Sequence, residues 1–487
     1  MQELLELNLA CLITKHGLMR GELMKITFIG AGSIVFAKKV IKDLLTFPKM
    51  REDTLIILED IDKHRLDLMH AYFQKYKEDN PRLLEGVTFE ATTDQKKAID
   101  EAKYVISAIQ VGSLDAYKLD LEIPLKHGIT QTVGDTLGPG GVFRGLRTMN
   151  AFESILEDIK DVGFQGGKQG NERGFAQKPL FLNYTNPMAI NTWYCNLIMP
   201  GSTVGLCHGV QGTANLLRMY VGAAPGEFYY LAAGINHMAW FLEIWFKDSF
   251  TPGSDWINAY PILWEHFEEE PEIMGSEKVR WDMMKATGFF MTESSGHLSE
   301  YLPYYRKRKD LLEKFKGADT GFDSLEHAEY YKSNIRKAST LEEEFTEELN
   351  KDHLSFETNS SSEYCAHVIN AIETNSPFRF NGNIMNHNAS FITNLPRGCC
   401  VEVPIFVDTG GLHPEGGISL PIQCQALCMS NIMVQKATVE GFLERDKEKI
   451  YHAVMLDPNT ASICSPGEIR EMVSEMFESQ ERWLPGF

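Results

Sequence analysis

The sequence predicts an α/β protein whose first half is a doubly wound, Rossmann-like parallel sheet. Three apolar runs have the length of buried strands: "ITFI" at 26–29, "TLIILEDID" at 54–62 and "YVISAIQVG" at 104–112. Between the first two, apolar residues recur with helical spacing from Val35 to Leu45. Strand and helix patterns that alternate in this way are typical of a parallel sheet with helices on both faces.

The chain has 487 residues, which is too long for one compact core and predicts more than one domain. We expect an N-terminal extension at residues 1–23, because the pattern of the fold begins at a second methionine, Met24. Residues 24–204 are expected to form the Rossmann domain and 205–487 a C-terminal α+β domain. A glycine-rich, polar stretch at 163–179 has no periodicity and indicates an exposed insertion.

Composition and charge exclude several classes of partner. The formal net charge is −20, which argues against a surface for nucleic acid or anionic membranes. No apolar run reaches the roughly 18–20 residues of a membrane span. The nine cysteines have no regular spacing, so they indicate thiols of a reducing cytoplasm, not a disulfide framework.

A glycine turn follows the first predicted strand at Gly30, Gly32 and Ser33. Such a turn lets a pyrophosphate approach the N-terminus of the next helix, where free N–H groups favour an anion. The third glycine of the usual pattern is replaced by Val35, and the turn alone is also common in proteins without a dinucleotide. The second strand ends in acids, of which Asp60 is the best candidate to bind the ribose hydroxyls. Together these features predict NAD, and the acid disfavours the 2′-phosphate of NADP.

The middle of the chain holds a second group of candidate ligand-binding residues. "QTVGDTLGPGGVFRGLRTMN" (131–150) is a glycine-dense loop that runs into a helix and carries Asp135 and Arg144. Such a loop lets backbone approach a ligand closely, although a flexible surface turn has the same composition. The next apolar run, "PLFLNYTNPMAIN", predicts a strand ending in Asn186-Pro187, at the sheet edge where ligands of open α/β sheets bind.

Two motifs, "GLCHGVQG" and "GINHMAW", place Cys207 and His237 among small and apolar residues. Two strand ends can each contribute one metal ligand, but a lone cysteine or histidine is more often an ordinary core residue. No second cysteine lies nearby, so a tetrahedral zinc motif is not supported. Further on, "TESSGHLSEYLPYYRKR" (292–308) concentrates acids, a histidine and tyrosines such as Tyr301, which suit either a buried helix face or proton transfer.

Ten motifs follow one another along the chain: "KITFIGAGSIVFAK", "LEDIDKHRL", "AIQVG", "GDTLGPGGVFRGLRT", "LNYTNPMA", "GLCHGVQG", "GINHMAW", "TESSGHLSEY", "FITNLP" and "VEVP". In this order they resemble the motifs of glycoside hydrolase family 4, most closely those of its melibiase-type α-galactosidases. The resemblance runs from Lys25 almost to the C-terminus. It implies a fold like that of lactate and malate dehydrogenases, with catalysis, metal binding and oligomer contacts in the C-terminal domain.

The resemblance also implies an unusual hydrolysis. This family is an exception to the two-carboxylate scheme of most glycosidases. NAD⁺ takes a hydride from C3 of the sugar, a base removes the proton at C2, and the group at C1 leaves by elimination. Water then adds, and the hydride returns, so that the cofactor is regenerated in each cycle.

Residue by residue, the resemblance assigns roles to the candidates. Cys207 and His237 match the ligands of a divalent cation, typically Mn²⁺, which polarises the C2 and C3 oxygens. Tyr301 matches the base at C2, and His208 the acid that protonates the leaving group. The remaining candidates line the pocket: Asn186 orients the sugar or the nicotinamide, and Asp135 and Arg144 lie beside it.

The leading hypothesis is a cytoplasmic α-galactosidase that depends on NAD⁺ and Mn²⁺, acts on small oligosaccharides and forms a homodimer or homotetramer. An α-galacturonidase is the main rival, because one additional basic residue is enough to bind a C6 carboxylate. A second class of functional hypothesis is a plain 2-hydroxy-acid dehydrogenase, in which the two motifs around Cys207 and His237 have no role. A non-catalytic sugar or nucleotide sensor is a third.

Overall fold

The structure is a computed structural model that describes residues 23–163, 179–248, 253, 255–269, 275, 277–317, 324–361, 363–387 and 390–487. Most of the expected N-terminal extension (1–23) and of the expected insertion (163–179) lies outside these residues. The description below therefore concerns the remaining part of the chain.

The first half is built on six parallel strands in the spatial order β3-β2-β1-β4-β5-β6. Their bounds are β1 (Met24–Ile29), β2 (Thr54–Glu59), β3 (Val87–Thr92), β4 (Tyr104–Ser107), β5 (Leu180–Asn183) and β6 (Thr203–Gly205). In the register, Ile26 pairs with Ile56 on one side and with Tyr104 on the other. This order is that of a Rossmann fold, so the predicted fold class is confirmed.

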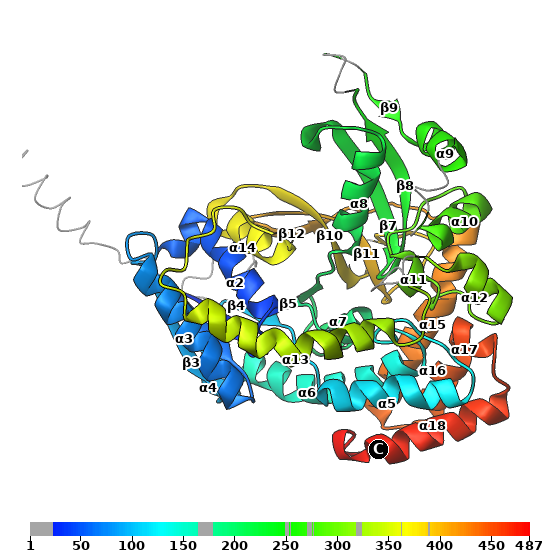
Figure 1. The fold of residues 1–487 in the computed structure, drawn as a ribbon, viewed down its shortest axis with the longest axis horizontal. Helices are drawn as coiled ribbons and strands as arrows, with labels where there is room; N and C mark the ends of the chain where they lie inside the picture. The colour runs from blue at the N-terminus through cyan, green and yellow to red at the C-terminus, as the bar shows by residue number, and fades with distance from the viewer. Residues whose placement is uncertain are drawn as a thin grey trace, which may run out of the picture.

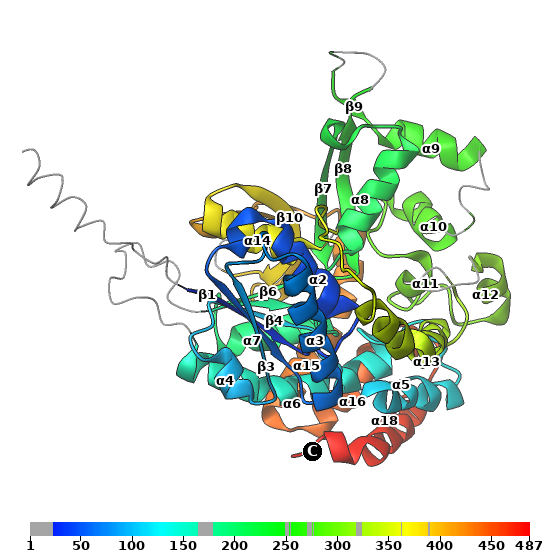
Figure 2. The ribbon, with the colours of Figure 1, turned by 60° about the vertical axis from the view of Figure 1, so that its left-hand side comes forward.

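Helices cover both faces of this parallel part (Figures 1 and 2). They are α2 (Phe36–Thr46), η1 (Pro48–Arg51), α3 (Lys63–Asp79), α4 (Gln95–Ile99), α5 (Ser113–Lys126), α6 (Gly138–Val162) and α7 (Met188–Ile198). Strands covered on both faces are apolar throughout instead of alternating, which explains the continuous runs in the sequence. In β1, for example, Phe28 and Ile29 are consecutive and both buried.

The prediction that a strand ends in Asn186-Pro187 is wrong in its boundary. β5 ends at Asn183, whose side-chain oxygen accepts a hydrogen bond from the backbone N–H of Thr185 (2.9 Å). This local hydrogen bond competes with the backbone hydrogen bonds between neighbouring strands, and the chain therefore turns out of the sheet here. Asn186 therefore lies on the loop that follows the strand, still at the carboxyl edge, and its peptide bond to Pro187 is cis.

The second half continues the same sheet with antiparallel strands. Gly205 of β6 pairs with Asn383 of β10, and the order runs on as β10-β11-β7-β8-β9, with β12 beside β11. The bounds are β7 (Phe228–Ile235), β8 (Met238–Phe246), β9 (Ile257–Asn258), β10 (Phe378–Met385), β11 (Cys400–Asp408) and β12 (Gly411–Pro414). One hydrophobic cluster includes residues of both halves. The boundary at 204/205 stays a prediction, because β6 crosses it.

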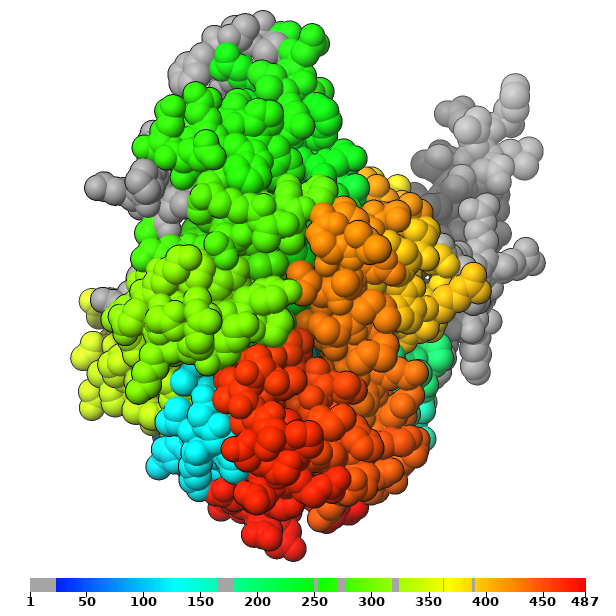
Figure 3. Space-filling model, turned by 90° about the vertical axis from the view of Figure 1, so that its right-hand side faces the viewer, coloured from blue at the N-terminus to red at the C-terminus, as the bar shows by residue number. Residues whose placement is uncertain are grey.

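The helices of the second half pack around this continuous sheet. They are α8 (Gly209–Tyr220), η2 (Pro225–Glu227), α9 (Tyr260–Glu269), α10 (Lys278–Thr287), α11 (Ser295–Leu298), α12 (Lys309–Phe315), α13 (Glu329–Leu349), α14 (Tyr364–Thr374), α15 (Ile422–Glu444), α16 (Lys447–Leu456), α17 (Pro458–Ala461), α18 (Pro466–Gln480) and η4 (Glu481–Trp483). Figure 3 shows the C-terminal helices, in orange and red, beside α5, in cyan. None of the helices in the described ranges combines the length and the apolar composition needed to cross a bilayer.

Candidate active site

The turn after β1 has the backbone geometry expected of a pyrophosphate site. Gly30 adopts φ +88°, a conformation that L side chains rarely adopt. A Cβ atom on Gly32 would lie 2.7 Å from Oδ2 of Asp60, so no larger residue fits there without a shift. Ser33 follows in the turn, its N–H donating to the carbonyl of Gly30. The side chain of Val35 is 58% exposed, so the missing third glycine does not disturb the packing of α2 on the sheet.

The three acids at the end of β2 have different environments. The side chain of Glu59 is buried, and burial followed by the charge of Asp60 raises its pKa to about 7. Asp62 caps α3 by accepting from the N–H of Arg65. Asp60 is partly exposed at the strand end and accepts from the N–H of Gly32 (2.7 Å). We call Gly30–Ser33 together with Asp60 the cofactor edge, and its geometry fits a ribose-pyrophosphate unit.

Cys207 and His237 are brought together by two connections of the sheet. Cys207 lies two residues after β6, and His237 lies in the two-residue turn between β7 and β8. The Sγ atom of Cys207 is 3.4 Å from Nε2 of His237. His237 adopts φ +61°, a left-handed conformation that costs free energy in a non-glycine residue and is often found at functional sites.

These two side chains fit a divalent cation. Two atoms bound to one ion at about 2.3 Å (sulfur) and about 2.1 Å (nitrogen) are separated by a distance close to that observed. Burial lowers the pKa of His237 to about 4, so its ring is neutral and can bind a cation. Burial and the charges of Glu402 and Glu293 raise the pKa of the Cys207 thiol well above its usual value. A coordinating cation removes that proton.

Additional ligand atoms are needed to complete such a site. In the described ranges, no group of three or more His, Cys, Asp or Glu side chains is arranged to hold a metal ion by itself. Glu293 lies on the side of the pair, with Oε2 3.5 Å from Nε2 of His237, the nitrogen that faces Cys207. Substrate oxygens or water are therefore expected to complete the coordination shell.

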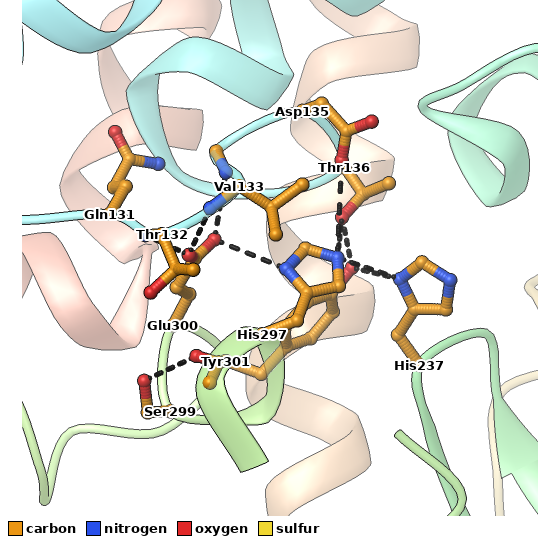
Figure 4. A network of polar contacts seen from close by, with 12 residues as sticks. Gln131, Thr132, Val133, Asp135, Thr136, His237, His297, Ser299, Glu300 and Tyr301 are labelled. Atoms are coloured by element: carbon orange, nitrogen blue, oxygen red, sulfur yellow. Dashed lines mark hydrogen bonds and ion pairs between the residues drawn. The ribbon is translucent and has the colours of Figure 1, made fainter. Parts of the chain in front are cut away.

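A buried set of polar side chains lies at Nδ1 of His237, the ring nitrogen that does not face Cys207 (Figure 4). Nδ1 of His237 lies 3.0 Å from Nε2 of His297 and 3.2 Å from the hydroxyl of Tyr301. The hydroxyl of Thr136 joins both partners, at 3.1 Å from Nε2 of His297 and 2.5 Å from the Tyr301 hydroxyl. We call this set the polar network; its members are Asp135, Thr136, His237, His297, Glu300 and Tyr301.

Tyr301 is a phenol whose proton is held tightly in this environment. The residue is 2% exposed, and burial raises its pKa well above the usual value, against the opposing hydrogen bond to Thr136. A tyrosine acts as a base only where positive charge lowers its pKa. A cation bound to His237, the neighbouring side chain, would supply such a charge.

Glu300 connects the polar network to the glycine-dense loop. Its carboxylate accepts hydrogen bonds from the N–H groups of Thr132, Val133 (2.7 Å) and Gly134 (2.9 Å), and lies 3.2 Å from Nδ1 of His297. Burial alone would lower the pKa of His297, but the hydrogen bond and the charge of Glu300 raise it to about 9. The sequence placed Glu300 and His297 in an acid-rich segment without assigning either a role.

Asp135 is the point at which the loop, the polar network and Asn186 meet. Its Oδ2 accepts from Nδ2 of Asn186 (2.9 Å) and lies 3.7 Å from Nη1 of Arg144. Its Oδ1 is buried, lies 3.9 Å from Nε2 of His297, and has no hydrogen-bond partner in the described part of the chain. A buried acceptor of this kind fits a ligand hydroxyl. Asp135, Arg144, Asn186 and Tyr301 are thus brought together with the cation pair.

His208 stands apart from these residues. It precedes α8, its side chain is 62% exposed, and its Nδ1 lies 3.8 Å from Oε1 of Glu363. The predicted acid is therefore positioned next to Cys207 in the chain but on the solvent side. Its role stays a prediction.

Comparisons with known proteins agree with the motifs. The model of "Family 4 glycosyl hydrolase" matches residues 25–223, and that of its C-terminal domain matches residues 232–460. An alpha-galactosidase of Rhizobium meliloti (strain 1021) is 37% identical over 95% of this chain and 89% of its own length. One of Bacillus subtilis (strain 168) is 35% identical over 95% and 99%.

More distant relatives have other names. An alpha-galacturonidase of Bacillus subtilis (strain 168) is 27% identical over 89% of this chain and 93% of its own. Among solved structures, a 6-phospho-alpha-glucosidase from gut microorganisms, in complex with NAD and Mn²⁺, shares the fold. Its TM-score is 0.75 at 18% identity, over 95% of this chain and 99% of that one. The family expected from the motifs is confirmed: the chain belongs to family 4 of the glycosyl hydrolases.

Proposed function

We propose that this protein hydrolyses α-galactosides with the help of NAD⁺ and Mn²⁺. The observation that carries the proposal is the Cys207–His237 pair, 3.4 Å apart, with Tyr301 directly behind His237. Two relatives, 37% and 35% identical, are named alpha-galactosidases. The solved family member with NAD and Mn²⁺ supports both cofactors.

The residues present fit both cofactors. The cofactor edge would hold NAD⁺, which supplies a hydride acceptor when bound. Cys207 and His237 would hold Mn²⁺, which supplies Lewis acidity when bound. The loop after β4 connects the two regions: a Cβ atom on Gly30 would lie 2.9 Å from Cγ2 of Ile109, and the N–H of Ile109 donates to Oγ1 of Thr185 (3.0 Å), one residue before Asn186.

The side chains around the cation pair have distinct tasks in this proposal. Tyr301 exchanges the C2 proton through its hydroxyl, which Thr136 orients by a hydrogen bond. Oδ1 of Asp135 accepts a hydrogen bond from a sugar hydroxyl, while Asn186 and Arg144 hold that carboxylate in place. His208, on the solvent side, is positioned to protonate a leaving group that extends outward.

The charges at the site favour a neutral sugar over a uronic acid. Arg144 lies 3.7 Å from the carboxylate of Asp135, so its positive charge is already compensated. Arg280 likewise pairs with Glu277 (3.0 Å). A buried cation whose charge is already balanced gains little from a second carboxylate. This supports the galactoside against the galacturonide, although a relative at 27% identity is named an alpha-galacturonidase.

Turnover of two chromogenic substrates tests the proposal. We expect p-nitrophenyl α-galactoside to be hydrolysed and the corresponding galacturonide to be left intact, in the presence of NAD⁺, Mn²⁺ and a thiol reductant. EDTA should abolish turnover, and Mn²⁺ should restore it. Preference for the galacturonide would contradict the choice of substrate. Net accumulation of NADH would contradict hydrolysis and indicate a plain dehydrogenase.

The proposal includes a cytoplasmic location and a homodimer or homotetramer. A reducing compartment suits Cys207, because only the reduced thiol can bind a cation. Light scattering coupled to size-exclusion chromatography measures the assembly, and a monomer would contradict this part.

A further inference from the structure

Helix α13 (Glu329–Leu349) lies across the outside of the Rossmann half, between α5 and α3 (Figures 1 and 2). Its sequence, "EYYKSNIRKASTLEEEFTEEL", is rich in charged residues. Its N-terminal end contacts the glycine-dense loop and α5, and its C-terminal end contacts α2 and α3. The residues between the two ends of the helix show what it can bind.

The N-terminal end is attached to the glycine-dense loop and to α5. The N–H of Ala328 donates to the carbonyl of Gln131 (2.7 Å), and that of Tyr330 to the carbonyl of Thr132 (3.2 Å). The ring of Tyr331 packs edge-on against Tyr117 in the first turns of α5, with ring centroids 5.3 Å apart. This end is therefore joined to the loop that carries Asp135.

The C-terminal end is attached to α2 and α3. The carboxylate of Glu348 accepts from Nζ of Lys38 (2.5 Å) and from the hydroxyl of Tyr72 (2.8 Å), and it lies 3.9 Å from Nζ of Lys42. Phe345 is buried against Tyr72, with ring centroids 5.1 Å apart. Lys38 is in the first turn of α2, directly after the predicted pyrophosphate turn.

Between these ends, the helix passes the adenosine side of the cofactor edge. Nε2 of His64 lies 2.6 Å from Oε1 of Glu342, and His64 is four residues after Asp60. From Tyr331 to Glu342 a helix advances about 16 Å. This stretch bridges the distance from the first turns of α5 to the first turn of α3, the two helices that flank the cofactor edge.

The middle of the bridge has no packed face in the described part of the chain. All six residues from Ile335 to Thr340 are exposed. Six residues exceed one helical turn of 3.6 residues, so they include positions on every side of the helix, the side toward the sheet among them. A helix exposed on all sides and fixed at both ends is typical of a bridge between two parts of a protein.

We propose that α13 is the outer wall of the dinucleotide site: residues 335–340 contact the bound NAD, and the anchor at Glu348 slows its release. The inference rests on the proposed function, because it takes NAD as the ligand of the cofactor edge. A wall of this kind suits an enzyme whose cofactor returns to its starting oxidation state in each cycle. Release of the dinucleotide is then not a step of turnover.

Hydrogen exchange of the full-length protein tests the contact. With EDTA present to exclude the cation, saturating NAD⁺ should slow exchange of the amides at 335–340 about tenfold, and leave α18 unchanged. Protection at Gly30–Ser33 without any at 335–340 would overturn the inference and leave the cofactor assignment intact. No protection in either segment would overturn both.

The release rate of NADH tests the anchor. Glu348→Gln removes the charge that binds Lys38 and Lys42, and we expect NADH to dissociate about tenfold faster in a fluorescence chase experiment. Glu347→Gln is the matched control, because Glu347 is exposed on the same helical turn. Release as slow as in the unmodified protein would overturn the anchoring role.

Discussion

The cofactor edge and the polar network hold their functional groups in different ways. At the cofactor edge, Gly32 and Asp60 are 28 residues apart, and one hydrogen bond joins the N–H of Gly32 to the partly exposed carboxylate of Asp60. In the polar network, Asp135, His237 and Tyr301 come from segments up to 166 residues apart, and all are nearly fully buried. Local backbone geometry is sufficient for the first region, whereas the second depends on the packing of the whole chain.

This difference predicts how each region responds to substitution. Changes in the polar network should impair catalysis more than cofactor binding, because in the proposed function its groups face the sugar. Changes at the cofactor edge should affect binding and stability with little influence on the chemistry. Four experiments, in order of decreasing expected effect, test that separation.

Removal of a cation ligand should have the largest effect. We expect Cys207→Ser to lower kcat about 1,000-fold or more, because a buried hydroxyl does not replace a thiolate as a ligand of a divalent ion. NAD⁺ affinity, measured by calorimetry, should stay unchanged. Cys464→Ser is the control, since that thiol only donates to the carbonyl of His127. Loss of NAD⁺ binding together with activity would show that the two regions are not separable.

The pH dependence of stability should reveal the buried carboxyl group of Glu59, next to the cofactor edge. The pKa of Glu59 is raised from 4.5 to about 7, so the native state keeps a proton that the unfolded state has released. Its contribution to stability is present below about pH 4.5 and is lost as the pH rises through about 7, amounting to about 3 kcal/mol.

Urea unfolding of Glu59→Gln at pH 5 and pH 8 measures this contribution. The amide cannot ionise, so the variant should gain stability relative to the unmodified protein as the pH rises. NAD⁺ is left out of both series, because a bound ligand adds its own stabilisation. An equal stability difference at the two pH values would contradict the assignment.

Substitution of Glu300, whose carboxylate binds the glycine-dense loop, should have an intermediate effect on catalysis. In Glu300→Gln the amide has one acceptor oxygen for three backbone N–H groups and loses the charge that faces His297. We expect kcat to fall about 10–100-fold, as for residues that orient a metal ligand through a neighbour. Glu326→Gln, on the exposed surface, should behave like the unmodified enzyme. A change confined to KM would indicate a role in binding alone.

Asp60 should have the smallest effect. Replacement of Asp60 by Ala removes one acceptor for the ribose hydroxyls and frees the N–H of Gly32. We expect about tenfold weaker NAD⁺ binding, equivalent to about 1.4 kcal/mol, with kcat unchanged at saturating NAD⁺. The ratio of NADP⁺ to NAD⁺ affinity should rise as the negative charge is lost. An unchanged NAD⁺ affinity would show that Asp60 does not bind the ribose hydroxyls.

The sequence alone was sufficient for the parallel sheet, the glycine turn and the family. These features are local: a buried strand needs a short apolar run, and a turn with positive φ needs glycine, so each is visible within a few residues. Cys207, His237 and Tyr301 were recognised because their neighbours matched known motifs. Spacing alone left two alternatives open for each: metal ligand or ordinary core residue for the first two, and proton transfer or a buried helix face for Tyr301.

Only the tertiary structure decided which polar groups meet and what their environment does to them. Glu300 reaches the backbone of a loop 166 residues away, and α13 returns from the second half to the face of the first. Such contacts are set by how helices and strands pack over long separations, and a single sequence carries no local signal for them. Burial, which shifts the pKa values of His237 and Glu59, is likewise a property of the folded chain.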